Sequence, residues 1–151
     1  NILGDTELVT ACSKALAEKM KAIDYDILVT AEAKSIPLAH ALSVEMKKPY
    51  LVLRRAYKPY MGETLHAETL SITTGKPQTL YLDEKDRQAV RGKRVALVDD
   101  VISTGSTLEG MRKVMDLAGA SVAAEAAVFT EGDPSDWKHI TALGHLPLFK
   151  S

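Results

Sequence analysis

The sequence predicts an α/β fold built on a parallel sheet, and two observations lead to that fold class. Short apolar runs have the length and continuous hydrophobicity of strands that are covered on both faces; they lie at residues 27–30, 50–53 and 94–98. Stretches with helical spacing alternate with these runs, and strands that alternate with helices pair in parallel through right-handed crossovers. Because 151 residues suffice for one sizeable core, we expect residues 1–151 to form a single domain.

A first helix is predicted from Asp5 to about Met20. Asp5 is a favourable N-cap residue, and an acid, Glu7, follows in the first turn. Apolar residues recur with helical spacing and predict the buried face; they are Leu8, Ala11, Cys12, Ala15, Leu16 and Ala17. We interpret Cys12, the single cysteine, as a small apolar member of this face.

The middle of the chain predicts a second helix and then a β-hairpin. The helix is expected at residues 37–46, with a proline in its first turn. Farther along, the runs Thr-Leu-Ser-Ile-Thr and Leu-Tyr-Leu alternate apolar and polar residues on either side of a Gly-Lys-Pro turn at 75–77. This period of two predicts a hairpin or two-stranded flap within residues 57–82. The charged stretch at 83–93 is expected to be solvated.

A third strand, a loop, a helix and a fourth strand complete the predicted core. The strand at 94–98 is expected to stop at Asp99, and a loop at 101–105 leads into the helix. Apolar residues of that helix share one face, and Gly119 suits its C-terminal end. An Ala- and Val-rich strand is predicted at 121–129.

Composition excludes several classes of protein. Hydrophobic residues make up 46% and charged residues 26%, which is ordinary for a globular domain and unlike a disordered or fibrous chain. A formal net charge of −1 argues against nucleic acid as a partner, and no apolar run approaches the ~20 residues of a membrane span. A single cysteine cannot form an internal disulfide, so we expect a cytoplasmic protein. Because the chain starts at Asn1 instead of Met, we expect that an N-terminal segment is missing.

The stretch from residue 95 to 107 carries the chemical information. A buried strand ends in two carboxylates, Asp99 and Asp100, and a loop of small hydroxyl residues and glycine then opens a helix. The loop consists of Ser103, Thr104, Gly105, Ser106 and Thr107. Free backbone N–H groups at a helix start bind phosphate, and paired acids accept hydrogen bonds from vicinal sugar hydroxyls. Each residue alone also fits a solvated turn or a helix cap, but the ordered string predicts a ribose 5-phosphate site.

This stretch resembles the 5-phosphoribosyl-1-pyrophosphate (PRPP) motif of the type I phosphoribosyltransferases, in which a strand, two acids and a Thr-Gly-rich loop follow one another. The match has no gaps from residue 95 to 107. The resemblance implies a parallel-sheet phosphoribosyltransferase (Rossmann-like) fold with a flexible β-hairpin flap. It also implies that Asp99 and Asp100 bind the ribose hydroxyls and that residues 103–107 hold the 5-phosphate.

Two more segments are similar to the adenine branch of this family. Residues 30–37 look like its pyrophosphate loop, which implies that Glu32, Ala33, Lys34 and Ser35 hold the pyrophosphate. Residues 54–59 are similar to the Arg-Lys-x-x-Lys-Leu-Pro segment that begins its flap, which adds Arg54, Arg55 and Lys58 to that group. Lys34, Arg55 and Lys58 are thereby implied as catalytic cations that stabilise the leaving pyrophosphate, and the resemblance further implies Mg²⁺ held by PRPP oxygens and a homodimer.

The base site matches the adenine branch less well. That branch carries Glu-Tyr-Gly in the flap, whereas this chain has Thr-Thr-Gly at 73–75 and is there more similar to xanthine phosphoribosyltransferase and to purine operon repressors. Glu63 and Glu68 remain alternative general acids. Val101 and Ile102 are the expected contacts to the base, and Asp136, Trp137 and residues 145–149 are candidate hood or edge elements, with packing favoured for Trp137.

The favoured function is therefore a Mg²⁺-dependent purine phosphoribosyltransferase that uses PRPP and a nucleobase, adenine favoured. The alternative is a PRPP-sensing regulatory protein without turnover. A fragment of a PRPP synthetase is the weakest reading, because no ATP-binding region is found.

Overall fold

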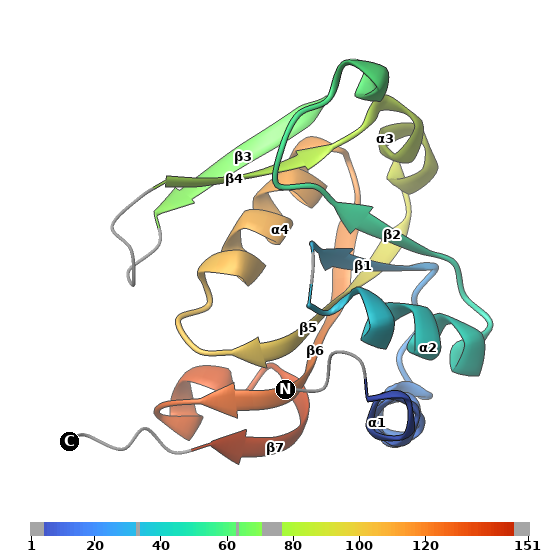
Figure 1. Cartoon of the computed structure of the whole chain (residues 1–151), viewed down its shortest axis with the longest axis vertical. Helices are drawn as coiled ribbons and strands as arrows, with labels where there is room; N and C mark the ends of the chain where they lie inside the picture. Colours follow the sequence, from blue (N-terminus) through green and yellow to red (C-terminus); the bar gives the residue numbers. More distant parts are fainter. Residues whose placement is uncertain (1–4, 33, 63, 71–76, 147–151) are drawn as a thin grey trace.

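A five-stranded, all-parallel sheet forms the centre of the computed structural model, which describes residues 5–146 apart from positions 33, 63 and 71–76 (Figure 1). The strand order is β2-β1-β5-β6-β7. The strands are β1 (Ile27–Ala31), β2 (Tyr50–Leu53), β5 (Arg94–Ile102), β6 (Ser121–Glu131) and β7 (Thr141–Leu146). The predicted α/β class with a parallel sheet is confirmed.

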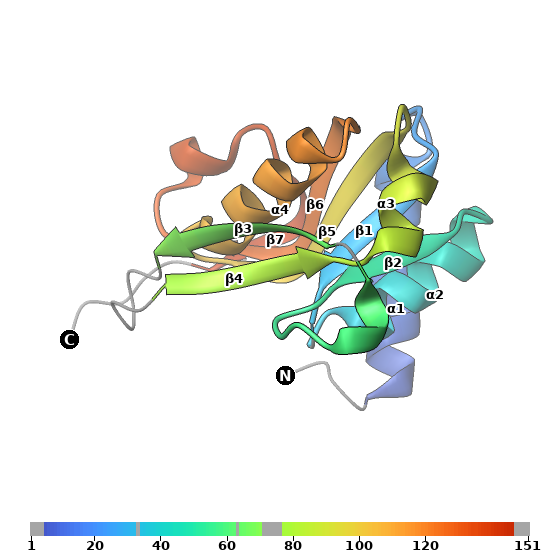
Figure 2. The same cartoon turned by 90° about the horizontal axis from the view of Figure 1, so that it is seen from above.

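Helices cover both faces of this sheet, and alternate residues of each strand therefore enter two separate cores (Figure 2). Helices α1 (Thr6–Met20) and α2 (Ile36–Met46) pack together on one face, where Leu28 and Val98 point. Helix α4 (Ser106–Leu117) packs on the other face, where Val29 and Leu97 point. All five residues of β1 are buried, as its continuous apolar run predicts.

The first helix is capped as predicted, and its buried face matches the expected one only in part: Cys12 and Leu16 are buried, whereas Ala11 and Ala15 are exposed. The Asp5 carboxylate accepts a hydrogen bond from the backbone N–H of Leu8 at 3.0 Å. Leu8 itself is 41% exposed, and the buried residues are Val9, Cys12, Ser13, Leu16 and Met20. The prediction gave too much weight to short alanines and excluded Ser13. The Ser13 hydroxyl donates to the carbonyl of Thr10 at 2.8 Å, which removes most of the cost of burying it.

The third sheet strand in the chain, β5, is longer than predicted. It continues through Asp99 and Asp100 to Ile102, and residues 101 and 102 pair with Phe129 and Thr130 of β6. The predicted loop at 101–105 is therefore wrong at its start. The neighbouring strand supplies backbone partners that a reading of side-chain pattern alone does not show.

The predicted hairpin is confirmed, and its base is part of the core. Strands β3 (Leu65–Leu70) and β4 (Pro77–Leu82) are antiparallel, while the predicted turn residues 75 and 76 lie outside the described residues. Leu80 and Leu82 are almost fully buried in the same core as α4, whereas His66 and Tyr81 pair on the opposite side of the hairpin. The hairpin is thus anchored to α4.

Four elements were not predicted. Residues Glu84–Val90 form α3, because the Asp83 carboxylate caps it by accepting from Asp86 N–H at 2.8 Å and Val90 is fully buried; apart from Val90 this stretch is exposed or half-buried, as expected. Strand β7 closes the far edge of the sheet, and short 3₁₀ helices occur at Pro59–Met61 and Pro134–Trp137. Within the described part of the chain, none of the helices combines the length and apolarity needed to cross a bilayer.

Candidate functional site

The strand order creates a crevice between the carboxyl ends of β1 and β5. From β1 the chain crosses through α2 to β2 on one side, and β5, on the other side of β1, leads into α4 on the opposite face of the sheet. Because the two loops leave adjacent strands toward opposite faces, a gap opens between them, and ligands of open α/β sheets bind at such switch points. Both predicted ligand loops, residues 31–35 and 103–105, lie at this point.

A buried pair of hydroxyls holds the β1 loop beside β5. Thr30 is fully buried, and its hydroxyl donates to the carbonyl of Val98 at 2.8 Å. Its oxygen lies 2.6 Å from the hydroxyl of Ser35, which also is buried. The Ser35 hydroxyl also lies 3.3 Å from the carbonyl of Ala31, so either hydroxyl can be the donor in the short contact. The predicted pyrophosphate residue Ser35 is therefore held against β1 at the start of α2, where its side chain makes no capping hydrogen bond.

Glu32 connects the end of β1 to the basic segment after β2. Its carboxylate accepts from the backbone N–H of Arg55 at 2.8 Å and pairs with Arg54 Nε at 3.0 Å, and its carbonyl accepts from Arg55 Nε at 2.7 Å. The Arg55 backbone hydrogen bond is the main cause that lowers the pKa of Glu32, so this group is ionised at neutral pH. Glu32 was expected to touch pyrophosphate, and the structure shows it holding the two arginines at the crevice.

Asp99 and Asp100 lie half-buried at the end of β5, on the other side of the crevice. The Asp99 carboxylate accepts from the N–H of Asp100 at 2.8 Å, and the Asp100 carboxylate accepts from the N–H of Val101 at 2.9 Å. Burial raises the pKa of Asp99 to about 8, the Asp100 carboxyl adds to this increase, and the charge of Arg55 opposes it. An acid kept partly protonated beside a second acid can both donate to and accept from a vicinal diol.

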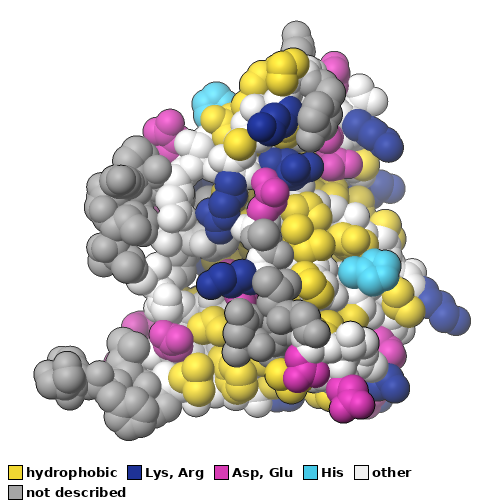
Figure 3. All heavy atoms as spheres, in the orientation of Figure 1, with side chains coloured by type: hydrophobic (Ala, Val, Ile, Leu, Met, Phe, Trp, Pro, Cys, Tyr) yellow, Lys and Arg dark blue, Asp and Glu magenta, His cyan; other side chains and the backbone are white. Residues whose placement is uncertain are grey.

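A hollow of about 360 Å³ brings half of the predicted residues together. Its lining consists of Ala31, Glu32, Lys34, Ser35, Arg55, Asp99, Asp100, Val101 and Thr107. Figure 3 shows Lys and Arg side chains gathered in the middle of the face in view, below the hairpin. A cationic rim beside two acids suits a ligand that carries both a polyanion and hydroxyl groups.

A smaller hollow of about 40 Å³ adjoins it and is formed by Asp99 and residues 101–108. Gly105 has φ +83°, a conformation that favours glycine, and it precedes the first residue of α4. The N-cap residue of α4 makes no side-chain hydrogen bond, so N–H groups of the first turn are available to an anion. The N–H of Ser106 donates to the Thr104 hydroxyl over a long distance of 3.3 Å. The predicted phosphate loop therefore has the expected geometry.

Some predicted residues lie elsewhere. Of the two expected base contacts, Val101 lines both hollows, whereas Ile102 is 2% exposed, packs in the core with α4 and lines only the smaller hollow. Lys58 is exposed at the start of a 3₁₀ helix and is not among the residues that line either hollow. Ala33 lies outside the described residues.

Two contributors had no signal in the sequence. Gln78 of the hairpin accepts from Arg55 Nη1 at 3.4 Å, which depends on the hairpin register. Thr30 reads as an ordinary strand residue, and its role depends on β5 being its neighbour.

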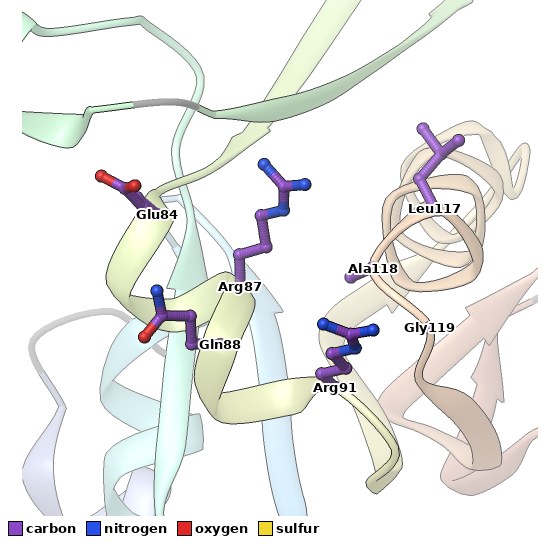
Figure 4. Close-up of a pocket in the computed structure, with 7 residues that line it drawn as sticks. All are labelled: Glu84, Arg87, Gln88, Arg91, Leu117, Ala118 and Gly119. Atoms are coloured by element: carbon purple, nitrogen blue, oxygen red, sulfur yellow. The ribbon is translucent and has the colours of Figure 1, made fainter.

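A larger hollow, about 540 Å³, lies between α3 and the C-terminal end of α4 (Figure 4). Arg87 and Arg91 enter it from α3, and Leu117 and Gly119 lie on its opposite wall. Cations beside a helix C-terminus stabilise the negative end of its dipole, which explains the two arginines without a ligand. None of the motif residues lines this hollow, so we place the functional site at the smaller crevice.

Comparisons with known proteins identify the family of the chain. A family model described as the phosphoribosyl transferase domain matches residues 1–143. A hypoxanthine/guanine phosphoribosyltransferase of Methanococcus voltae is 40% identical over 120 residues, which are 78% of this chain and 60% of that protein. An adenine phosphoribosyltransferase of Thermosipho africanus is 30% identical over 82% of this chain and 69% of its own length. The purine biosynthesis repressor of Bacillus subtilis is 28% identical over 82% of this chain and 42% of its own length.

Solved structures show the same fold. The adenine phosphoribosyltransferase of Thermoanaerobacter pseudethanolicus superposes with a TM-score of 0.80 at 20% identity, covering 94% of this chain and 83% of that one. The Giardia lamblia enzyme complexed with 9-deazaadenine gives 0.81 at 18% identity, covering 96% and 83%. The present chain spans 60% of the length of the first two curated relatives, both hypoxanthine/guanine phosphoribosyltransferases.

Proposed function

Because the chain belongs to the phosphoribosyl transferase domain family, we propose that it is a purine phosphoribosyltransferase. It transfers the 5-phosphoribosyl group from PRPP to a purine base and releases pyrophosphate. One observation carries the proposal. The acid pair Asp99 and Asp100 lies between the cations Lys34 and Arg55 and the amide-rich start of α4, in the order pyrophosphate, ribose, 5-phosphate that PRPP requires.

Each end of the substrate has its own group of residues. Lys34 and Arg55 bind the pyrophosphate from one rim of the crevice, with Arg54 held beside them by Glu32. The Asp pair binds the ribose hydroxyls, and residues 103–107 bind the 5-phosphate through backbone N–H groups and hydroxyls. Lys58 reaches the pyrophosphate only if the segment after β2 moves, because it does not line the crevice.

In the transfer step a nitrogen of the base forms a bond to ribose C1 as the bond from C1 to the pyrophosphate oxygen breaks. The leaving pyrophosphate keeps the electron pair, and the base loses one proton. Positive charge develops on the sugar and negative charge on the leaving group, so fixed cations such as Arg55 stabilise the transition state. Val101 supports the base from the β5 side, and Glu68, which is exposed on the hairpin, is the described candidate for the proton transfer; the other candidate, Glu63, lies outside the described residues.

We include Mg²⁺ as the cofactor, held by PRPP oxygens. The described residues contain no group of three or more His, Cys, Asp or Glu able to hold a metal ion. Mg²⁺ binds through substrate phosphates and water with few protein carboxylates, which fits a crevice with two acids. When bound, the ion neutralises charge on the leaving pyrophosphate.

The identity of the purine base that accepts the phosphoribosyl group is a further part of the proposal. The β1 loop and basic segment are similar to the adenine branch, whereas curated relatives at 34–40% identity act on hypoxanthine and guanine by their names. The test incubates purified protein with PRPP, Mg²⁺ and one base at a time, from adenine, hypoxanthine, guanine, xanthine and orotate. Pyrophosphate release with a purine supports the enzyme, and the preferred base settles adenine against the oxopurines. Release with orotate alone would contradict a purine enzyme.

A PRPP sensor is the second candidate, favoured by the similarity to the Bacillus subtilis purine repressor. A sensor binds PRPP with the same residues but turns over none of the bases. Calorimetry with PRPP, run beside the activity assay, separates the two: binding without pyrophosphate release supports the sensor, and no binding contradicts both.

A homodimer is also proposed, with its interface near α2, which follows the pyrophosphate loop. Val44 of α2 is 65% exposed, which is unusual for a large apolar side chain. Sedimentation velocity of the wild type and of Val44→Glu tests this, because a charge within the interface should yield monomers.

A further inference from the structure

Trp137 lies against the phosphate loop although it comes from a separate part of the chain. A Cβ placed on Gly105 would lie 3.1 Å from Cη2 and 3.3 Å from Cζ3 of the Trp137 ring. The six-membered edge of the indole therefore packs directly on the backbone of the loop at its positive-φ residue. The sequence predicted a packing role for Trp137, and the structure identifies its contact.

The other end of the indole is fixed to the sheet. Trp137 Nε1–H donates to the carbonyl of Glu131, the last residue of β6, at 2.6 Å. The residue ends a 3₁₀ helix whose first turn is capped by Asp133, and its carbonyl accepts from Ile140 N–H at 3.0 Å. Its ring is partly buried against the core beneath α4. The indole thus bridges the end of β6 and the loop that follows β5.

The loop needs such an external support. Glycine adopts positive and negative φ with similar ease, so Gly105 alone does not select the conformation that directs N–H groups to a phosphate. The N-terminus of α4 lacks a side-chain cap, and a 3.0 Å contact between the Thr104 and Ser106 hydroxyls is local to the loop itself. Trp137 is absent from the lining of the phosphate hollow, which consists of Asp99 and residues 101–108. It acts on the ligand through the loop.

We propose that Trp137 is a positioning residue that holds the 5-phosphate loop in its binding conformation, an inference that rests on the proposed function. A loop already in the bound geometry loses less conformational freedom on binding, and affinity for the phosphate end rises accordingly. Trp137 is the only tryptophan in the chain. Its emission therefore reports directly on the loop that it contacts.

The experiment measures binding of ribose 5-phosphate and, separately, of pyrophosphate by calorimetry to the wild type, Trp137→Phe and Trp137→Leu. Leucine removes the ring, and we expect about tenfold weaker binding of ribose 5-phosphate, the order of one lost hydrogen bond or packing contact. Phenylalanine keeps part of the ring and should give an intermediate loss. Pyrophosphate binds at the other end of the crevice, so its affinity should stay within about twofold in every variant. In the wild type, ribose 5-phosphate should change tryptophan emission with the calorimetric Kd, and pyrophosphate should not.

Ile140→Val is the matched control. Ile140 packs against the same core as Trp137, and its backbone N–H donates to the Trp137 carbonyl. Its side chain, however, is not among the atoms nearest Gly105. This variant should bind ribose 5-phosphate like the wild type, and far-UV circular dichroism checks that every variant is folded. If Trp137→Leu does not fold, Trp137→Phe and the wild-type emission still test the proposal.

The outcomes separate this inference from the proposed function. A wild type that binds neither ribose 5-phosphate nor PRPP contradicts the proposed function itself. A wild type that binds ribose 5-phosphate while folded Trp137 variants bind it equally well, or while its emission is unchanged at saturation, overturns the positioning role alone. Equal losses for ribose 5-phosphate and pyrophosphate would also overturn it, since they would indicate general destabilisation.

Discussion

Asp99→Asn should make the protein more stable at alkaline pH while it weakens ribose binding. The wild-type Asp99 has a pKa of about 8 instead of 3.8, chiefly because burial disfavours its charged form. Between these two pH values the folded state holds a proton that the unfolded state has released. The wild type therefore loses stability as the pH rises from about 4 to about 8, and asparagine, which cannot ionise, removes this loss.

The structure sets a bound on the effect. The pKa difference is about four units, and 1.36 kcal/mol per unit gives at most about 6 kcal/mol. Asp99 reaches the crevice beside Arg55, and solvent and relaxation reduce such energies, so we expect about 1–2 kcal/mol at pH 9. For a domain of this size that corresponds to a Tm about 4 °C above the wild type. At pH 9, where Asp99 is ionised, loss of the acceptor carboxylate should weaken ribose 5-phosphate binding about tenfold or more.

Thermal unfolding of both proteins at pH 5 and pH 9 measures the first effect, and calorimetry with ribose 5-phosphate measures the second. Asp116→Asn makes the same charge change at an exposed position of α4 and controls for net charge. The stability gap between Asp99→Asn and the wild type should widen from pH 5 to pH 9. A gap of equal size at both pH values would refute the assigned cause, and unchanged ribose 5-phosphate binding would refute the role of Asp99.

The remaining predictions concern the cationic rim and the buried polar links. Arg55→Gln should weaken pyrophosphate binding about tenfold by calorimetry, since it removes a charged donor, whereas Arg87→Gln, the same change on α3, should have no effect. Thr30→Val deletes the buried hydroxyl that donates to β5 and should lower the free energy of unfolding in urea by about 1–2 kcal/mol. Glu125→Gln removes the charge of a carboxylate that is 7% exposed and paired with Arg112, and it should lower the free energy of unfolding by about 2 kcal/mol at pH 7. A decrease below about 0.5 kcal/mol would contradict a stabilising ion pair.

Structural elements whose sequence pattern lies within a single segment were predicted well. Continuous apolar runs identified the central strands, because burial on both faces leaves few polar positions in them. The period of two around a Gly/Pro turn identified the hairpin. The string from Asp99 to Thr107 predicted a loop that leads into a helix, and the structure shows this loop lining a hollow at the start of α4; its ligand stays a prediction.

Features that depend on contacts between distant segments were not predictable. The buried face of α1 depends on the angle at which it meets α2, and a stripe of alanines does not determine that angle. Helix α3 has a single buried apolar residue, Val90, so its sequence has no helical stripe to detect. Strand β7 carries half-buried residues along most of its length, and pairing with β6 stabilises it more than its own pattern does.

The candidate site shows the same division, and β1 explains why. Thr30 bonds the neighbouring strand β5, and Glu32, two residues later, bonds the segment that follows β2. One short segment thus positions both the acid pair and the arginines, because β1 lies between β5 and β2 in the sheet. In the sequence alone, Thr30 is an ordinary strand residue and Glu32 an ordinary loop acid. The sheet topology lets them link the two groups of residues that we propose bind the two ends of PRPP. If the proposed function holds, we expect a change at Thr30 or Glu32 to weaken binding of both ends of PRPP, whereas a change at Arg55 or Gly105 should weaken binding of one end.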